Sequence, residues 1–241
     1  MAVSTHRIHL PALDDDFVDE VLDELVSMRE TLPEISVEVP ARHASTVPAQ
    51  AADSEFHLLV ALVESVLDEE VDDPTPRTYA QLAIIALLPG VPEALALQVA
   101  FGRKVGVQHV RKMTLLRTAA RVRGLTMDEY VAELVALGRI PQDRLVQLFL
   151  GRSQRSPKGG RMKRGSEVLR RVASSVPEGF RPPILCAVAW LHWAAGRRAI
   201  ALAYLDESSR IDPGHILAHG LAAVAAERMP DWCVDKPGAE P

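Results

Sequence analysis

Hydrophobic residues recur at helical spacing along most of this 241-residue chain. The clearest case is residues 14–30, where an apolar stripe lies opposite a row of acidic residues. The stripe consists of Phe17, Val18, Val21, Leu22, Leu25 and Met28. Pro33 ends the segment, because proline cannot continue a helix. The pattern predicts an acidic amphipathic helix whose stripe needs a cover, either the protein's own core or another chain.

Residues 34–52 differ in composition from the helix before them. A short strand is considered at residues 35–39, and prolines and many small residues follow it, as is typical of a linker. We therefore predict an acidic amphipathic helix with a flexible linker over residues 1–52 and a helical domain over residues 53–235. Residues 236–241 are expected to form a disordered tail.

From residue 53 onward, residues that start or stop a helix recur at short intervals. Thr75 with Pro76 marks one start, Pro89 with Gly90 marks a stop, and Pro92 marks a restart. No later segment alternates for long as a strand does, so the predicted class is all-α, an irregular helical bundle with short connections. The predicted helices cover residues 53–67, 77–88, 92–101, 107–123, 127–137, 141–150, 161–174, 183–194, 199–211 and 215–227.

The last long helices predict a helical hairpin near the C-terminus. Ala189 and Ala201 are small enough to let two helices approach closely, and Gly196 lies in the expected turn. Asp212 and Pro213 end the second helix. This spacing resembles one tetratricopeptide unit of about 34 residues. A solenoid needs about three such repeats, so the resemblance implies a single tetratricopeptide-like hairpin and not a peptide-binding array.

Short motifs are spread over the second half of the chain. They are Leu-Gly-Arg-Ser at 150–153, Ala-Trp-Leu-His-Trp-Ala-Ala-Gly at 189–196, Asp-Pro-Gly-His at 212–215 and Met-Pro-Asp-Trp at 229–232. These motifs resemble an actinobacterial family, domain of unknown function 4192, over about residues 80–235. Members of that family usually begin with a longer region that holds apolar strands, whereas residues 1–77 here look acidic and helical. The resemblance implies fold and lineage, and it brings no catalytic residues, ligand or cofactor.

Charge is distributed unevenly along a chain whose formal net charge is −5. Residues 1–77 hold 18 acidic against 4 basic residues, and residues 103–171 hold 17 basic against 5 acidic residues. Such asymmetry is typical of solvated faces that keep a protein soluble, and also of a segment that contacts phosphates. The candidate nucleic-acid-binding residues are Arg103, Lys104, Arg111, Lys112, Arg152, Arg155, Lys158, Arg161, Lys163 and Arg164.

Aromatic residues make up only 5% of the chain. We therefore expect the helices to pack through small and aliphatic side chains, and not through aromatic anchors.

Signatures of catalysis or of a bound cofactor are weak. His215 and His219 stand four residues apart, as metal ligands on one helix do, but two ligands do not make a site. Further ligands that could lie nearby are His192, Cys186 and Cys233. The glycine-rich loop at residues 157–166 lacks the Gly-Lys-Ser/Thr ending and the preceding strand of a phosphate-binding loop. We expect no metal site, no cofactor and a non-catalytic protein, and an enzyme stays a third possibility.

Export and membrane insertion are not indicated by the sequence. The N-terminus lacks a basic region followed by an apolar one, and the apolar stretch at residues 82–88 is far shorter than the roughly 20 residues of a membrane span. Cys186 and Cys233 are too few for a disulfide framework, and they fit a reducing compartment. Apolar neighbours indicate that Cys186 is a small core residue. We predict a cytoplasmic protein without membrane association.

Two functional hypotheses follow. In the first, the protein is non-catalytic and contacts an unknown protein partner, with Phe17, Val21 and Leu25 of the acidic helix as the partner-binding residues. In the second, the basic segment 103–171 binds nucleic acid without sequence specificity, and the acidic N-terminal helix masks it. The sequence makes no prediction of the oligomeric state.

Overall fold

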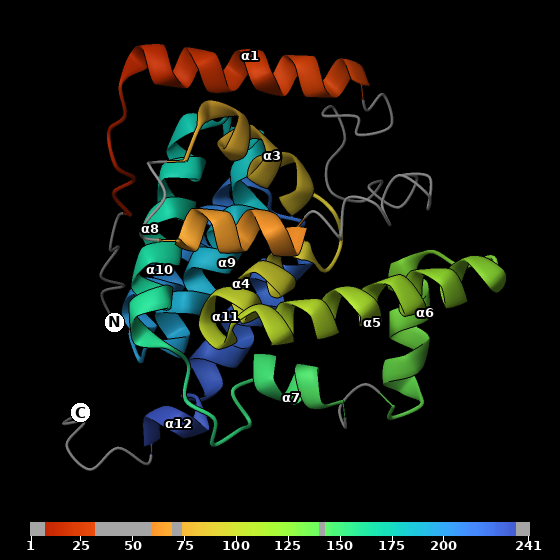
Figure 1. Ribbon diagram of the computed structural model, residues 1–241. Helices are drawn as coiled ribbons and strands as arrows, with labels where there is room; N and C mark the ends of the chain where they lie inside the picture. Colours follow the sequence, from red (N-terminus) through yellow and green to blue (C-terminus); the bar gives the residue numbers. More distant parts are fainter. Residues whose placement is uncertain (1–7, 32–58, 69–73, 140–142, 235–241) are drawn as a thin grey trace.

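A computed structural model of the chain describes residues 8–31, 59–68, 74–139 and 143–234 (Figure 1). Helices are the only regular elements in these ranges, so the predicted all-α class is confirmed. The strand considered at residues 35–39, the predicted linker and the predicted tail lie outside the described residues. The elements are α1 (Asp15–Thr31), α3 (Pro76–Ala86), α4 (Val91–Phe101), α5 (Arg103–Val122), α6 (Met127–Ala136), α7 (Arg144–Phe149), α8 (Gly159–Ser175), α9 (Arg181–Ala194), α10 (Arg198–Ile211), α11 (Ile216–Glu227) and α12 (Asp231–Val234), with a 3-10 turn at Glu178–Phe180 and helical residues at 59–67.

Two observed helices, α5 and α7, start furthest from their predicted positions. Helix α5 begins four residues earlier than expected, because Gly102, with φ +91°, separates it from α4 and Gly106 lies inside it. A Cβ atom at Gly106 would lie 2.3 Å from Oε1 of Gln98, so the glycine lets α5 pass close to α4. Helix α7 is shorter than expected, because Asp143 caps its start by accepting hydrogen bonds from the N–H groups of Leu145 and Val146.

Helix α9 lies at the centre of the bundle and packs against α3, α4, α8, α10 and α11. Every residue from Pro182 to Leu191 is buried. Helix α4 is nearly as buried, with only Glu93 partly exposed. These two helices are apolar on all sides, as helices in the interior of a protein are.

The predicted C-terminal hairpin is present as α9 and α10. Ala189 and Ala201 are both fully buried, so the two helices approach closely where the small residues stand. Gly196 forms the turn with φ +82°, and Asp212 follows the last residue of α10. The far side of α9 contacts α4 and α8, so the protein's own helices cover the hairpin there.

A cluster of aromatic residues contradicts the expectation that aromatic anchors are absent. Trp190 stacks on Phe149 at 5.4 Å, and Phe101 lies edge-on to both Trp190 and Trp232. Each of the three indole N–H groups donates a hydrogen bond to a backbone carbonyl; the acceptors are Phe149, Arg228 and Ala194. The aromatic residues are few, but they gather at one place and hold α7, α9 and the short α12 together.

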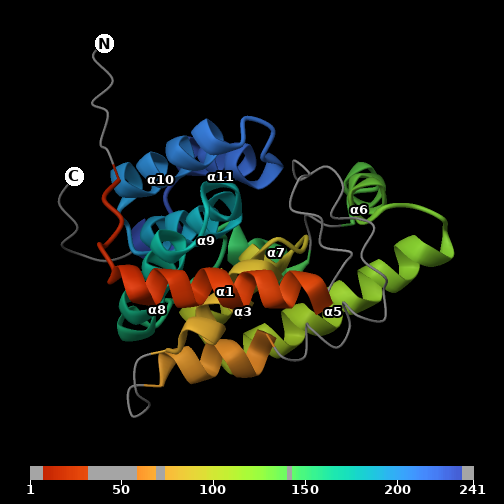
Figure 2. The same cartoon turned by 90° about the horizontal axis from the view of Figure 1, so that it is seen from above.

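Helix α1 packs on the protein's own core, which is the first of the two covers considered for its stripe. Val21 is fully buried and Leu25 nearly so, and the ring of Phe17 lies edge-on to Tyr79 of α3 at 5.2 Å. Figure 2 shows α1 running across α3 and α8. Burying one such aliphatic side chain stabilises a fold by roughly 1.5–3 kcal/mol. The described part of residues 1–52 therefore belongs to the same packed body as the helices that follow.

Candidate functional site

Three of the predicted basic residues, Arg155, Lys158 and Arg161, donate hydrogen bonds to the backbone at the C-terminal end of α4. The guanidinium of Arg161 donates to two carbonyls there, that of Arg155 to a third, and the backbone N–H of Lys158 to a fourth, at 2.8–3.4 Å. The accepting carbonyls belong to Gln98, Val99, Ala100 and Phe101. The last carbonyls of a helix have no partner within the helix and carry partial negative charge. Arg155 and Arg161 therefore stabilise α4.

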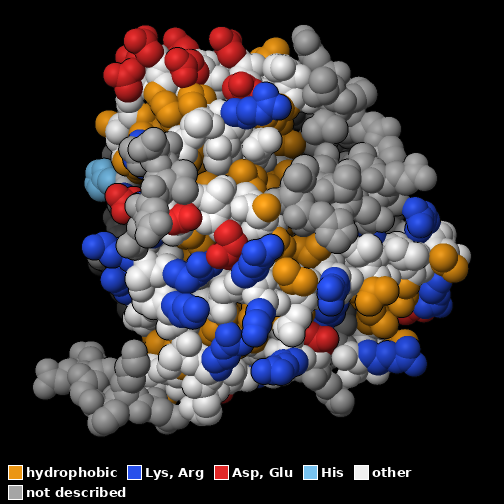
Figure 3. Space-filling model, viewed as in Figure 1, with side chains coloured by type: hydrophobic (Ala, Val, Ile, Leu, Met, Phe, Trp, Pro, Cys, Tyr) orange, Lys and Arg blue, Asp and Glu red, His pale blue; other side chains and the backbone are white. Residues whose placement is uncertain are grey.

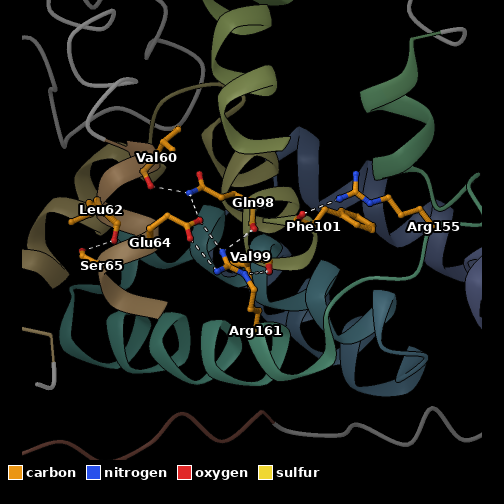
Figure 4. A network of polar contacts seen from close by, with 9 residues as sticks. All are labelled: Val60, Leu62, Glu64, Ser65, Gln98, Val99, Phe101, Arg155 and Arg161. Carbon is orange, nitrogen blue, oxygen red and sulfur yellow. Dashed lines mark hydrogen bonds and ion pairs between the residues drawn. The ribbon is translucent and has the colours of Figure 1, made fainter. Parts of the chain in front are cut away.

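A polar network continues from Arg161 into the core (Figure 4). Arg161 forms a bidentate ion pair with Glu64, at 3.1 and 2.8 Å, and the fully buried Gln98 donates to Glu64 and to the carbonyl of Val60. Burial raises the pKa of Glu64, but the hydrogen bonds from Arg161 and Gln98 outweigh it, and the pKa lies below its usual value. Glu64 is thus ionised at neutral pH and neutralises Arg161.

Four of the ten predicted cations have partners within the protein. Lys112 pairs with Asp143 at 2.7 Å, and Arg164 donates to the carbonyl of Asp68. Arg155 and Arg161 bind the end of α4, as described above. The other six are exposed and make no hydrogen bond or ion pair through their side chains with another described residue. We call them the basic face: Arg103, Lys104, Arg111, Arg152, Lys158 and Lys163.

Four residues of the basic face lie at the starts of two long helices, Arg103 and Lys104 on α5 and Lys158 and Lys163 on α8. Arg111 lies further along α5, and Arg152 lies in the loop between α7 and α8. Figure 3 shows Lys and Arg side chains gathered around the first turns of α5 and α8, on the side of the molecule seen there. Neither helix has a side-chain hydrogen bond at its N-cap, which is Gly102 for α5 and Lys158 for α8. The acidic side chains of α1 lie at another edge of this view. Helix α1 covers α3 and does not provide the predicted masking.

A cavity of about 560 Å³, here named the cationic cavity, lies between α8, the end of α9 and α12. Its lining includes four cations and one carboxylate, Lys163, Arg170, Arg171, Arg197 and Glu167. His192 also lines it, with Nε2 3.4 Å from Oγ of Ser166. Burial lowers the pKa of His192 to about 4, and the charges of Arg197 and Arg170 act in the same direction. The charge predictions included Lys163 but missed Arg170, Arg171 and Arg197 as members of one group.

A second cavity, of about 870 Å³, has a different character. It lies between the turn from α3 to α4, α7 and α11, and most of its lining side chains are apolar. Its charged lining residues are Glu93 and Asp212, and no described lining residue is Lys or Arg. Ile216 at its edge is 77% exposed. We call this cavity the apolar groove.

The histidine pair considered for a metal has structural roles. His215 caps α11 through Nδ1, which accepts from the N–H of Ala218, and Nε2 of His219 lies 2.8 Å from the carbonyl of Pro213. Cys186 lies 3.7 Å from His215, and burial raises the pKa of its thiol to about 12. Over the part of the chain that the structure describes, no three His, Cys, Asp or Glu residues are grouped to hold a metal ion.

Comparison with protein-family models, curated proteins and solved structures found no match to this chain. The resemblance to domain of unknown function 4192 therefore stays a prediction. No helix within the described ranges has both the length and the apolarity to cross a membrane.

Proposed function

We propose that the protein binds nucleic acid through phosphate contacts made by the basic face, without reading base sequence. The observation that carries this proposal is that six exposed cations have no ion-pair partner among the described residues, and four of them lie at the starts of α5 and α8. Cations that replace the counterions of a phosphate backbone gain free energy from the release of those ions. Free N–H groups at a helix start add a favourable site for an oxygen of the same phosphate.

The arrangement of the basic face favours contacts with the backbone over contacts with bases. Reading base edges requires several side chains from one helix that enters the major groove. The cations come instead from α5, from the start of α8 and from the loop between α7 and α8. On α5 itself, Lys112 is already paired with Asp143. A surface of this kind positions phosphates and carries no code for sequence.

Protein–protein contact through α1, the first hypothesis from the sequence, receives less support. Its three proposed contact residues, Phe17, Val21 and Leu25, lie against α3 and the surrounding core. A partner would have to displace α1 from the bundle in order to reach them. The basic face needs no such rearrangement, which is why we favour nucleic acid.

Fluorescence anisotropy with labelled single- and double-stranded oligonucleotides at several salt concentrations tests the proposal. The variant Lys104→Ala/Arg152→Ala/Lys158→Ala removes three exposed cations and leaves the backbone bond from residue 158 to α4 in place. Each lost phosphate contact lowers the slope of log affinity against log salt by about 0.9 for double-stranded DNA, so the triple variant should lose about 2 to 3 in slope.

A matched control removes three exposed cations elsewhere, in Arg77→Ala/Arg139→Ala/Arg198→Ala. This control should keep the affinity and the salt slope of the wild-type protein. Equal losses in the two triple variants, or no binding to either oligonucleotide at low salt, would overturn the proposal.

A further inference from the structure

The cationic cavity differs from the basic face because its charged groups line one hollow between several elements. Lys163 and Arg170 reach it from α8, and Arg197 reaches it from the turn between α9 and α10. With Arg171 and the carboxylate of Glu167 included, and with His192 neutral, the formal charge of the lining is +3. Like charges that converge in this way repel one another in the absence of an anion. The lining therefore favours an anionic ligand.

Parts of this lining are held in position before any ligand arrives. Arg170 donates to the carbonyl of His9 at 2.6 Å. The ring of Tyr204 stacks on that of His192, with centroids 5.4 Å apart and planes within 8°. Such contacts reduce the conformational entropy that a ligand would otherwise have to remove.

Other cations at this site remain available for a ligand. Lys163 and Arg197 are exposed, and their side chains make no hydrogen bond or ion pair with any described residue. Ser166 adds a hydroxyl that is able to donate a hydrogen bond, and it lies on the same helix as Lys163. Two exposed cations and one hydroxyl can therefore bind an anion that Arg170 attracts.

The remaining lining is mostly apolar, and the cavity is large enough for an organic group. Met162, Leu191 and Trp232 are buried residues that contribute to the cavity wall. A volume of about 560 Å³ is within the range of small-molecule sites in proteins, roughly 300–1,000 Å³. An ordinary inorganic anion would leave much of this space empty.

We propose that the cationic cavity binds the phosphate group of an organic phosphate monoester. Planar guanidinium groups match the oxygens of phosphate in a bidentate geometry, and the cavity lining includes three of them. A dianionic phosphate offsets most of the +3 charge of the lining, whereas a single carboxylate offsets only one unit. The monoester has two sources, a free phosphorylated metabolite or the terminal phosphate of a nucleic-acid strand. The site is separate from the basic face, except that Lys163 belongs to both.

Isothermal titration calorimetry of the full chain with inorganic phosphate and with a nucleoside monophosphate tests this site. Arg197→Ala should weaken binding of both probes about tenfold or more, since a hydrogen bond to a charged group contributes at least that much. Arg197→Lys should recover part of the loss, because it restores the charge without the planar fork. The matched control is Arg198→Ala, an exposed arginine next in sequence that does not line the cavity.

A pair of oligonucleotides with and without a 5′-phosphate distinguishes the two sources. Tighter binding of the phosphorylated strand, lost in Arg197→Ala, assigns the site to strand ends. Binding of the nucleoside monophosphate with no preference between the two strands assigns it to a free metabolite, and both results support the proposal. It is overturned if neither phosphate probe binds up to about 10 mM, or if Arg198→Ala weakens binding as much as Arg197→Ala does.

The outcome here is independent of the proposed nucleic-acid binding. Lys104→Ala/Arg152→Ala/Lys158→Ala should leave phosphate binding in the cavity unchanged, because none of these three residues lines it. Loss of phosphate binding in this triple variant would overturn the assignment to the cavity.

Discussion

Helices α1 and α8 have the same length, 17 residues, and opposite charge. Both are amphipathic, and both bury an apolar side against the bundle. The polar side of α1 carries the exposed acids Asp16, Asp19, Glu20 and Asp23. The polar side of α8 instead contributes Lys163, Ser166 and Arg170 to the cationic cavity, which the end of α9 and α12 also line.

The difference teaches that amphipathicity alone does not identify a functional helix. The pattern of α1 is the cleaner of the two in the sequence, and it describes a helix that covers α3. A polar side becomes a candidate site only where a second element encloses it and restricts solvent. Three elements meet at the polar side of α8, whereas Glu20, Asp23 and Glu24 of α1 border a more open hollow beside the start of α3.

The largest expected effect tests whether α1 belongs to the core. Val21→Asp places a carboxylate at a fully buried position, and it should cost at least about 4 kcal/mol of unfolding free energy or detach α1. Val26 lies on the same helix and is 59% exposed, so Val26→Asp should change stability by no more than about 0.5 kcal/mol. Urea denaturation and amide hydrogen exchange measure both variants. A stable Val21→Asp protein with protected α1 amides would show that the helix does not depend on this contact.

A smaller effect tests how closely α8 approaches α4. A Cβ atom at Gly165 would lie 2.4 Å from Cγ1 of the buried Val99, so Gly165→Ala should destabilise the protein by about 1–3 kcal/mol. Gly160, also on α8, has no neighbour within 4 Å of such an atom. Gly160→Ala should therefore be neutral or add up to about 1 kcal/mol, since alanine is the better helix former. Thermal unfolding compares the two, and equal stabilities would contradict the close approach.

The smallest effect is a dependence on pH on the α8 side of the molecule. The pKa of His192 is lowered from 6.5 to about 4 in the folded protein, by burial and then by Arg197 and Arg170. As the pH falls from 6.5 to 4, the unfolded chain takes up a proton that the folded chain does not bind, so stability decreases. Because the side chain is partly exposed, we expect about 1–2 kcal/mol from this residue.

Urea denaturation at pH 7 and pH 4 measures that dependence. The variant His192→Gln should lose less stability than the wild-type protein over the same interval. If the two proteins lose the same amount, His192 is not the neutral imidazole that this geometry implies.

Much of the fold could be predicted because helix formation depends on near neighbours. The periodicity of residues 14–30 and the turn at Gly196 depend on contacts within a few positions, and the structure confirms both. Helix α12 was missed because four residues are too few to show a period. This short helix is held by Trp232, whose indole N–H donates a hydrogen bond to the carbonyl of Ala194, 38 positions earlier in the chain.

The candidate sites depended on contacts that no local pattern records. Glu64 and Gln98 are 34 positions apart, and Arg161 lies 97 positions from Glu64. Nothing in the sequence separates Arg161, which neutralises Glu64, from Lys158 nearby, whose side chain is exposed. The charge count of residues 103–171 was therefore right in sum but did not show which cations are available.

By itself the sequence determined the all-α class, the positions of most helices and the separation of acidic from basic segments, because each depends on residue type and short-range spacing. Tertiary structure alone decided that α1 covers the core, that four of the ten candidate cations have internal partners and that Arg170, Arg171 and Arg197 line one cavity with Lys163. The physical reason is that burial and ion pairing are properties of a surface formed by distant segments, and a side chain's partner depends on which helices pack together.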